Sequence, residues 1–247
     1  MLKHPDVLWL NTSSSLQVFD QRLIRFLSRK VSIAEWDYFQ TQDEPCILNT
    51  AVTLLHDYLK SINKPIHLIG HSTSGLIGLL YARKYPERVK SLTLLSVGVY
   101  PTINWQAHYY VNRHLIPCSR QIILTQMVKS LFGKQNQTTT QNIVRILERD
   151  LDWSLSIHSL LKRQSMVPRG VEVPLMVCAA YDDMVVDPNL LEGWRPFLKP
   201  GDRIWKCDQG GHFFHHFYPV NVAHQLLEFW GKDLPALSEI TDEILAG

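Results

Sequence analysis

Short, almost continuously apolar segments alternate along this chain with longer segments in which apolar residues recur at helical spacing. Strands that are apolar on both faces are typical of a parallel sheet covered by helices on both sides. The alternation therefore predicts an α/β fold built on a mostly parallel sheet flanked by helices. The predicted strands comprise residues 7–10, 31–34, 66–69, 92–95, 175–179 and 203–207.

One long interval breaks this alternation because it contains no convincing strand. Residues 101–173 carry only helical patterns, so we expect a helical cap inserted between two parts of the core, residues 1–100 and 174–247. The insertion holds nine lysines and arginines between Arg113 and Arg169 against four acidic residues, which favours an acidic or amphipathic substrate. The predicted helices comprise residues 47–60, 75–84 and 220–230 in the core and residues 109–115, 121–132 and 141–158 in the insertion.

Composition limits the class of protein. The chain has 247 residues, of which 45% are hydrophobic, and a formal net charge of +2, so no nucleic-acid partner is expected. No apolar run approaches the roughly 20 residues of a membrane span, and no signal-peptide pattern is visible, so we expect a cytoplasmic protein. The four cysteines form no CxxC pair, and Cys178 and Cys207 lie in apolar runs that predict burial. The acidic stretch after Lys232 is expected to form either a surface helix or a partly mobile tail.

The segment richest in chemical information is GHSTSG at residues 70–75, directly after a predicted strand. An apolar strand enters a sharp turn of small residues, and the turn opens a helix, which is the context of a nucleophile elbow. Such a turn lifts the Ser72 hydroxyl above the sheet edge, and the helix N-terminus offers N–H groups to a developing oxyanion. Because Gly-x-Ser-x-small also occurs by accident, the interpretation of Ser72 as a nucleophile depends on finding a base and an acid.

The chain resembles the α/β-hydrolase superfamily over nearly its whole length. GHSTSG is similar to the Gly-His-Ser-x-Gly-Gly elbow of that family, with Ser74 at the fifth position, where glycine is usual. Residues 81–89, YARKYPERV, are also similar to the segment that follows the elbow in the family. The resemblance implies an α/β-hydrolase fold and a triad in the chain order serine, acid, histidine.

A serine hydroxyl needs a base to accept its proton, and His212 is the first candidate among eleven histidines. It follows Gly210-Gly211 after the last predicted strand, a position that resembles the catalytic histidine loop of the family. His215 and His216 are close rivals that we interpret as ordinary loop or rim residues, and we interpret His71 in the elbow as a packing residue. Three histidines of the insertion are interpreted as surface residues, with substrate contact as the alternative: His108, His114 and His158.

The acid is expected after a strand that precedes His212. Residues 174–188, PLMVCAAYDDMVVDP, resemble the strand, Gly-x-x-Asp turn and Val-Pro pattern of the family, with Ala180 in place of glycine. This register places Asp183 at the acid position, where it would orient the imidazole and stabilise its protonated form. The neighbouring Asp182 is interpreted as a turn residue.

Two backbone N–H groups are expected to stabilise the oxyanion. One belongs to Thr73, the residue after the nucleophile. The second comes from the loop after the first strand, where Asn11-Thr12 replaces the His-Gly pair of the family, and Thr12 or Ser13 is the expected donor. Residues 36–40 also differ from the Asp-x-Pro-Gly-like loop of the family. Both departures border the expected pocket.

No cofactor or metal is expected. The sequence has no GxGxxG and no P-loop. His212, His215 and His216 form a histidine cluster, but no carboxylate spacing completes a zinc site around them.

Two classes of function fit the sequence. The first is hydrolysis of a carboxylic ester or related acyl group, in a small-molecule or amphipathic substrate, through an acyl-enzyme. The second is a non-catalytic binding protein on the same fold; the Asn11-Thr12 loop favours it, and the joint presence of Ser72, Asp183 and His212 argues against it. Six residues of the insertion are expected either to bound a pocket or to pack: Trp105, Tyr109, Tyr110, Leu115, Phe132 and Trp153.

Overall fold

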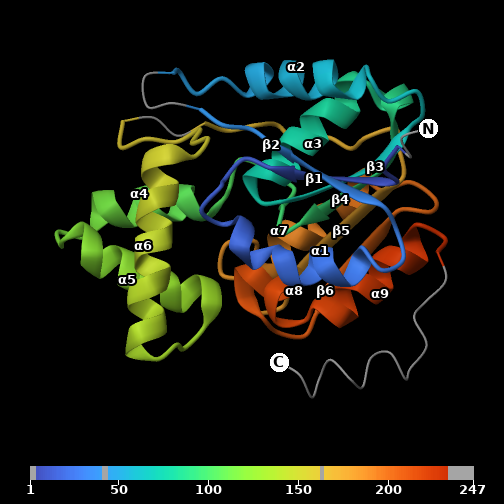
Figure 1. Cartoon of the computed structure of the whole chain (residues 1–247). Helices are drawn as coiled ribbons and strands as arrows, with labels where there is room; N and C mark the ends of the chain where they lie inside the picture. Colours follow the sequence, from blue (N-terminus) through green and yellow to red (C-terminus); the bar gives the residue numbers. More distant parts are fainter. Residues whose placement is uncertain (1–3, 41–43, 162–163, 233–247) are drawn as a thin grey trace.

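A computed structural model describes residues 4–40, 44–161 and 164–232 of the chain. Over these residues, six strands form one parallel sheet in the order β2-β1-β3-β4-β5-β6 (Figure 1). The chain moves outward from β1 to β2 and then returns to β3, so the strand order reverses between β1 and β3, where open α/β sheets bind their ligands. The strands are Val7–Asn11 (β1), Ile33–Asp37 (β2), Ile66–His71 (β3), Val89–Leu95 (β4), Leu175–Ala180 (β5) and Arg203–Cys207 (β6).

The sheet separates two apolar layers, because successive side chains of a strand point to opposite faces. Strand β1 shows this alternation: Leu8 and Leu10 belong to one buried cluster, and Val7 and Trp9 belong to the other. Helices cover both faces (Figure 1), which confirms the predicted fold class. The first layer includes α2 (Leu48–Leu59) and α3 (Thr73–Lys84), and the second includes α1 (Gln21–Leu27) and α9 (Pro219–Phe229).

The ends of all six predicted strands lie within three residues of the observed ends. At β2 the prediction was residues 31–34, whereas the strand is Ile33–Asp37 and so begins two residues later. The reason is local, because the N–H of Val31 donates to the carbonyl of Leu27 and so belongs to the turn that ends α1. Helix α1 itself is a feature that the sequence analysis missed. Cys178 and Cys207 are buried, as predicted.

Between β4 and β5, the described residues of the 101–173 segment form three helices and no strand. Each helix begins one to four residues before its predicted start, because Asn104, Ser119 and Asn136 accept the N–H of the third helical residue and so cap the first turn. Figure 1 places the three helices together beyond the carboxyl ends of the central strands. They are α4 (Trp105–Leu115), α5 (Arg120–Phe132) and α6 (Gln137–Trp153).

Shorter elements complete the described part of the chain. Among the described helices, none has the length and apolar character needed to cross a bilayer. The acidic stretch after Lys232 lies outside the described residues. The remaining helices are α7 (Pro188–Glu192) and α8 (Phe214–Phe217), and the 3-10 helices are Gln17–Phe19, Pro86–Arg88, Arg195–Phe197 and Gly211–Phe213.

Candidate functional site

Ser72 stands between the last residue of β3 and the first residue of α3. Its backbone angles, φ 50° and ψ −120°, are uncommon for a residue with a side chain. Gly70 and Gly75 permit the turn, because a Cβ atom on Gly70 would lie only 2.7 Å from the backbone nitrogen of Gly75. The N–H of Ser72 donates to the carbonyl of Leu95 in β4 at 2.9 Å, which ties the turn to the sheet. This is the geometry of a nucleophile elbow.

His212 lies in the loop after β6 and is fully buried. Its Nδ1 lies 3.1 Å and 3.2 Å from the two carboxylate oxygens of Asp183. The carbonyl of His212 accepts hydrogen bonds from Ser96 Oγ at 3.0 Å and from His71 Nε2 at 2.9 Å. Asp183 therefore holds the imidazole, while His71 and Ser96 hold the backbone that carries it.

Asp183 is a buried carboxylate whose charge is strongly stabilised. Its Oδ1 accepts the N–H groups of Val185 at 2.8 Å and Val186 at 3.1 Å. Burial by itself raises the pKa of Asp183, but the charge and hydrogen bond of His212, together with the two N–H groups, lower it to about 2. Asp183 is thus ionised at neutral pH, as an acid that orients a histidine must be.

The two atoms that would exchange a proton are both buried and unpaired. Neither Ser72 Oγ nor His212 Nε2 has a hydrogen-bond partner among the described residues. The aspartate–histidine half of the predicted triad is therefore formed, whereas a serine–histidine hydrogen bond is not. Catalytic hydrogen bonds in unliganded enzymes are often long and shorten only when substrate binds.

Asp182, the neighbour of Asp183, anchors the histidine loop. Its two carboxylate oxygens accept the N–H groups of Gly211 at 2.8 Å and Gly210 at 3.2 Å. The sequence interpretation of Asp182 as a turn residue missed this bond across 29 residues. Asp182 and Asp183 thus hold the same loop at two points, one through its backbone and one through the imidazole of His212.

The interpretation of His215 as a loop or rim residue is wrong. His215 is fully buried, and its Nε2 lies 2.9 Å from Asp20 Oδ1. His216 is half-buried, and its Nδ1 donates to the carbonyl of Phe19 at 3.2 Å. Both side chains tie the segment after His212 to the segment before α1, and no sequence pattern predicts that these two segments are neighbours.

The three histidines of the insertion differ in their environment. His114 is exposed, as expected, but His158 is buried and its Nε2 donates to the carbonyl of Thr102 at 2.7 Å, so its interpretation as a surface residue is wrong. His108 is half-buried, and both its burial and the charge of His212 lower its pKa. His108 therefore lies within electrostatic range of the predicted base.

The expected oxyanion donors from the first loop are already hydrogen-bonded within the protein. The N–H of Thr12 donates to Ser74 Oγ at 3.0 Å, and the N–H of Ser13 donates to Asn11 Oδ1 at 2.9 Å. Thr73 is the first residue of α3, where helical N–H groups have no partner within the helix. Ser74 stands where the elbow of the family usually has glycine, and Thr12 stands in the loop where the family usually has His-Gly. The structure joins these two unusual residues by a hydrogen bond.

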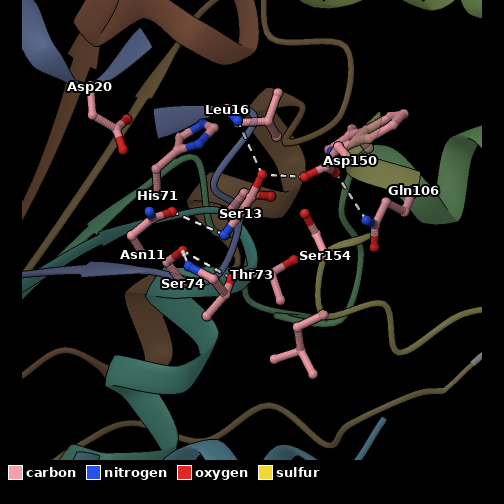
Figure 2. A pocket seen from close by; sticks show the side chains of 14 residues that line it. Asn11, Ser13, Leu16, Asp20, His71, Thr73, Ser74, Gln106, Asp150 and Ser154 are labelled. Carbon is pink, nitrogen blue, oxygen red and sulfur yellow. Dashed lines mark hydrogen bonds between the residues drawn. The ribbon is translucent and has the colours of Figure 1, made fainter. Parts of the chain in front are cut away.

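Ser72 is one of the residues that line a small pocket of about 30 Å³. Figure 2 shows this pocket from close by. The insertion supplies part of its wall, so these helices do reach the predicted nucleophile. Of the six residues of the insertion expected at a pocket or in packing, Trp105 alone belongs to the described lining, while Leu115 and Trp153 are exposed. The lining comprises Asn11, Thr12, Ser13, Leu16, Asp20, His71, Ser72, Thr73, Ser74, Trp105, Gln106, Asp150, Ser154 and Leu155.

Asp150 of α6 is the polar centre of the insertion side of the pocket. It is 1% exposed and accepts hydrogen bonds from Ser13 Oγ and, at 3.0 Å, from Gln106 Nε2 (Figure 2). Burial raises the pKa of Asp150, and the hydrogen bonds that it accepts oppose this. Within the described lining there is no lysine or arginine, so the basic residues of the insertion do not form this wall.

A second buried cluster borders the opposite side of the pocket. Ligand-type atoms of Asp20, His71 and His215 lie within 4.8 Å of one another, a set that differs from the histidine cluster noted in the sequence. Asp20 Oδ2 also accepts a hydrogen bond from Trp9 Nε1 at 3.0 Å. Burial raises the pKa of Asp20 to about 6, although the charge of His71 and the Trp9 bond oppose the rise. Asp20 thus joins β1 to the segment after His212.

Comparisons with known proteins agree with this geometry. The α/β-hydrolase fold family model matches residues 59–116, which include the elbow. An uncharacterized protein of Synechocystis sp. is 47% identical over 91% of this chain and 89% of its own length. An uncharacterized protein of Nostoc sp. is 43% identical over 91% of this chain and 90% of its own length.

A solved structure has a similar fold. The structure of a serine hydrolase involved in carbazole degradation is 17% identical, covers 91% of this chain and 90% of its own, and superposes with a TM-score of 0.63. The parallel sheet, the elbow between β3 and α3, and the family match over residues 59–116 lead to one conclusion. The chain has the α/β-hydrolase fold.

Proposed function

We propose that this protein is a serine hydrolase that cleaves a carboxylic ester or related acyl substrate. The observation that carries the proposal is the arrangement around Ser72: its backbone has positive φ, its Oγ is unpaired beside a pocket, and the buried His212 is held by Asp183 through Nδ1. A residue kept in an unfavourable conformation with an unpaired hydroxyl costs stability, so such an arrangement indicates function.

The reaction follows from these positions. Ser72 Oγ attacks the substrate carbonyl carbon while His212 Nε2 accepts the hydroxyl proton, and His212 then returns that proton to the departing alcohol. A water molecule, activated by His212 in turn, attacks the acyl-enzyme and releases the carboxylic acid and Ser72. Asp183 stabilises the imidazolium throughout, consistent with its low pKa.

The oxyanion is stabilised by backbone groups at the two neighbouring strand ends. The N–H of Thr73 is the first donor, as in other elbows. The N–H of Thr12 becomes the second donor only when it leaves Ser74 Oγ, its partner in the unliganded protein. The exchange replaces a bond to a neutral hydroxyl by a bond to a charged oxygen, which is stronger.

The helical insertion acts as a lid in this proposal, with residues 101–173 covering a core made of residues 1–100 and 174–247. Trp105, Gln106 and Asp150 from the insertion line the same pocket as Ser72. Ser72 Oγ is buried beside this wall, and in this proposal the wall moves when substrate enters. When closed, the lid excludes water and selects substrates by shape.

A non-catalytic binding function is the second candidate, and one observation favours it. The N–H groups of Thr12 and Ser13 are both bonded to side chains, so the second oxyanion donor is engaged before any ligand arrives. A binding protein needs a pocket but no free oxyanion donor. The two candidates differ in whether removal of the Ser72 hydroxyl abolishes turnover or leaves the function unchanged.

Steady-state hydrolysis of p-nitrophenyl esters from acetate to octanoate tests the proposal. We expect measurable turnover with a preference for the shortest acyl groups, because the pocket is small. Ser72→Ala should lower kcat at least about a thousandfold. Ser130→Ala is the matched control, since Ser130 lies on α5 and, within the described residues, the only hydrogen bond of its side chain goes to the carbonyl of Gln126. Turnover that Ser72→Ala leaves unchanged would overturn the proposal.

A further inference from the structure

The wall of the pocket formed by α4 and α6 is rich in hydrogen-bond acceptors. Gln106 is 2% exposed, and its Oε1 is buried without a hydrogen-bond partner in the described part of the chain. Its amide orientation is fixed, because Nε2 donates to Asp150 Oδ2 (Figure 2), so Oε1 turns away from Asp150. A buried acceptor without a partner costs free energy unless a ligand supplies the missing donor.

The position of His212 decides which part of a substrate meets this wall. In the proposed reaction, the leaving oxygen receives its proton from His212 Nε2, so the alcohol part must lie toward His212. His212 and Asp183 do not belong to the described lining of the pocket, whereas Ser72 and Thr73 do. The pocket therefore receives the acyl part.

We propose that the pocket selects short acyl groups that carry an N–H or O–H donor, with Gln106 Oε1 as the acceptor, and that Asp150 disfavours acyl groups that carry a carboxylate. This inference rests on the proposed hydrolase function and adds its substrate class. The small volume limits the acyl group to a few heavy atoms. Asp150, which is buried and holds Gln106, acts as a positioning residue and as the source of negative potential.

Isosteric esters measure the donor preference directly. Phenyl 3-hydroxybutanoate and phenyl 3-methylbutanoate differ only in a hydroxyl against a methyl group. We expect kcat/KM to be about tenfold higher for the hydroxy ester, the effect of one hydrogen bond to an otherwise unpaired buried acceptor. Phenyl 3-aminobutanoate should share this advantage, and phenyl hydrogen succinate, corrected for spontaneous hydrolysis, should be the poorest substrate.

Two variants test whether Gln106 and Asp150 cause the substrate preference. Gln106→Met removes the acceptor at nearly constant size and should bring the hydroxy-to-methyl ratio close to one, while Gln126→Met, at an exposed position of α5, should leave the ratio unchanged. Asp150→Asn keeps the shape of the side chain and should raise kcat/KM for the succinate ester relative to the hydroxy ester. It also provides a second test if Gln106→Met fails to fold.

A binding measurement separates this inference from the proposed reaction. Titration of the same esters into Ser72→Ala protein does not depend on hydrolysis, and the hydroxy ester should bind about tenfold more tightly than the methyl ester. Equal affinities for the two esters, or a ratio that Gln106→Met does not change, would overturn the inference. Such a result would leave the hydrolase proposal standing if wild-type protein still turns over esters. Selective binding without turnover would instead overturn the hydrolase proposal alone.

Discussion

The backbone N–H of Thr12 donates a hydrogen bond to Ser74 Oγ at 3.0 Å, across 62 residues of sequence. The two hydroxyls also lie 3.1 Å apart, so Thr12 and Ser74 are joined twice. Both positions depart from the usual residues of the superfamily, and the structure brings the two departures into contact. The side chain of Ser74 therefore holds the N–H that we propose as the second oxyanion donor.

Ser74→Ala should release this donor. We expect kcat for short esters to rise by up to about tenfold, because the Thr12 N–H is then free to bind the oxyanion. The free energy of unfolding should fall by about 1 kcal/mol as the buried hydrogen bonds are lost. Thr12→Val is the control, since it removes the Thr12 hydroxyl and keeps the backbone bond to Ser74. A lower kcat in Ser74→Ala would show instead that the Ser74 hydroxyl assists the reaction.

Asp183→Asn and Asp182→Asn should have different effects. Asp183→Asn removes the charge that fixes the tautomer of His212, so we expect kcat to fall by about 10⁴, the magnitude known for the equivalent change in a serine protease. Asp182→Asn keeps an oxygen for Gly211 and should lower thermal stability more than kcat. Parallel kinetic and melting measurements on the two variants check this. If kcat falls further in Asp182→Asn than in Asp183→Asn, then Asp182, and not Asp183, is the residue that orients His212.

The stability contributed by Asp183 should depend on pH. Its pKa falls from 3.8 to about 2 on folding, so the folded protein holds this proton less tightly than the unfolded chain. The contribution, about 2 kcal/mol, is fully present above pH 4 and is lost as the pH falls through 2. The difference in free energy of unfolding between wild type and Asp183→Asn should therefore shrink as the pH falls from 4 toward 2. Denaturant titrations at each pH measure it, and a difference that does not shrink below pH 4 would contradict the assignment.

Gly70→Ala should damage the elbow. A Cβ atom at Gly70 would lie 2.7–2.8 Å from backbone atoms of Ser74 and Gly75, which cannot move without displacing the turn that carries Ser72. We expect lower thermal stability and loss of ester turnover. Gly78→Ala is the matched control on α3, because its Cβ would meet only the terminal methyl groups of Leu10 and Leu92 at 3.0–3.1 Å. If melting temperatures and turnover are the same in both variants, close approach at Gly70 is not what shapes the elbow.

The sequence predicted the parts of the site that follow directly from a strand. Asp183 and His212 each stand just after a strand end, and the parallel order of β5 and β6 brings them together. Asp150 could not be predicted in this way. It lies on a helix of the insertion, its partner Ser13 is 137 residues away, and its helical spacing alone predicts only a polar surface position.

The sequence also did not predict the residues whose contacts depend on tertiary packing. Asp20 and His215 are 195 residues apart, and only the docking of α8 beside α1 makes them neighbours. Helix α1 was missed because its short apolar pattern, with Leu23, Ile24, Phe26 and Leu27, is ambiguous between strand and helix. The local patterns therefore specified the sheet and the elbow, whereas tertiary contacts determined the pocket wall.

Covalent labelling with an organophosphonate tests the central claim most directly, because such a reagent needs an activated serine and does not depend on the identity of the substrate. Intact mass and peptide mapping should find one adduct, on Ser72, in wild-type protein and in Ser130→Ala. The adduct should be absent in Ser72→Ala and should form far more slowly in His212→Ala. Native wild-type protein that acquires no adduct, or an adduct that Ser72→Ala retains, would contradict the assignment of Ser72 as the nucleophile.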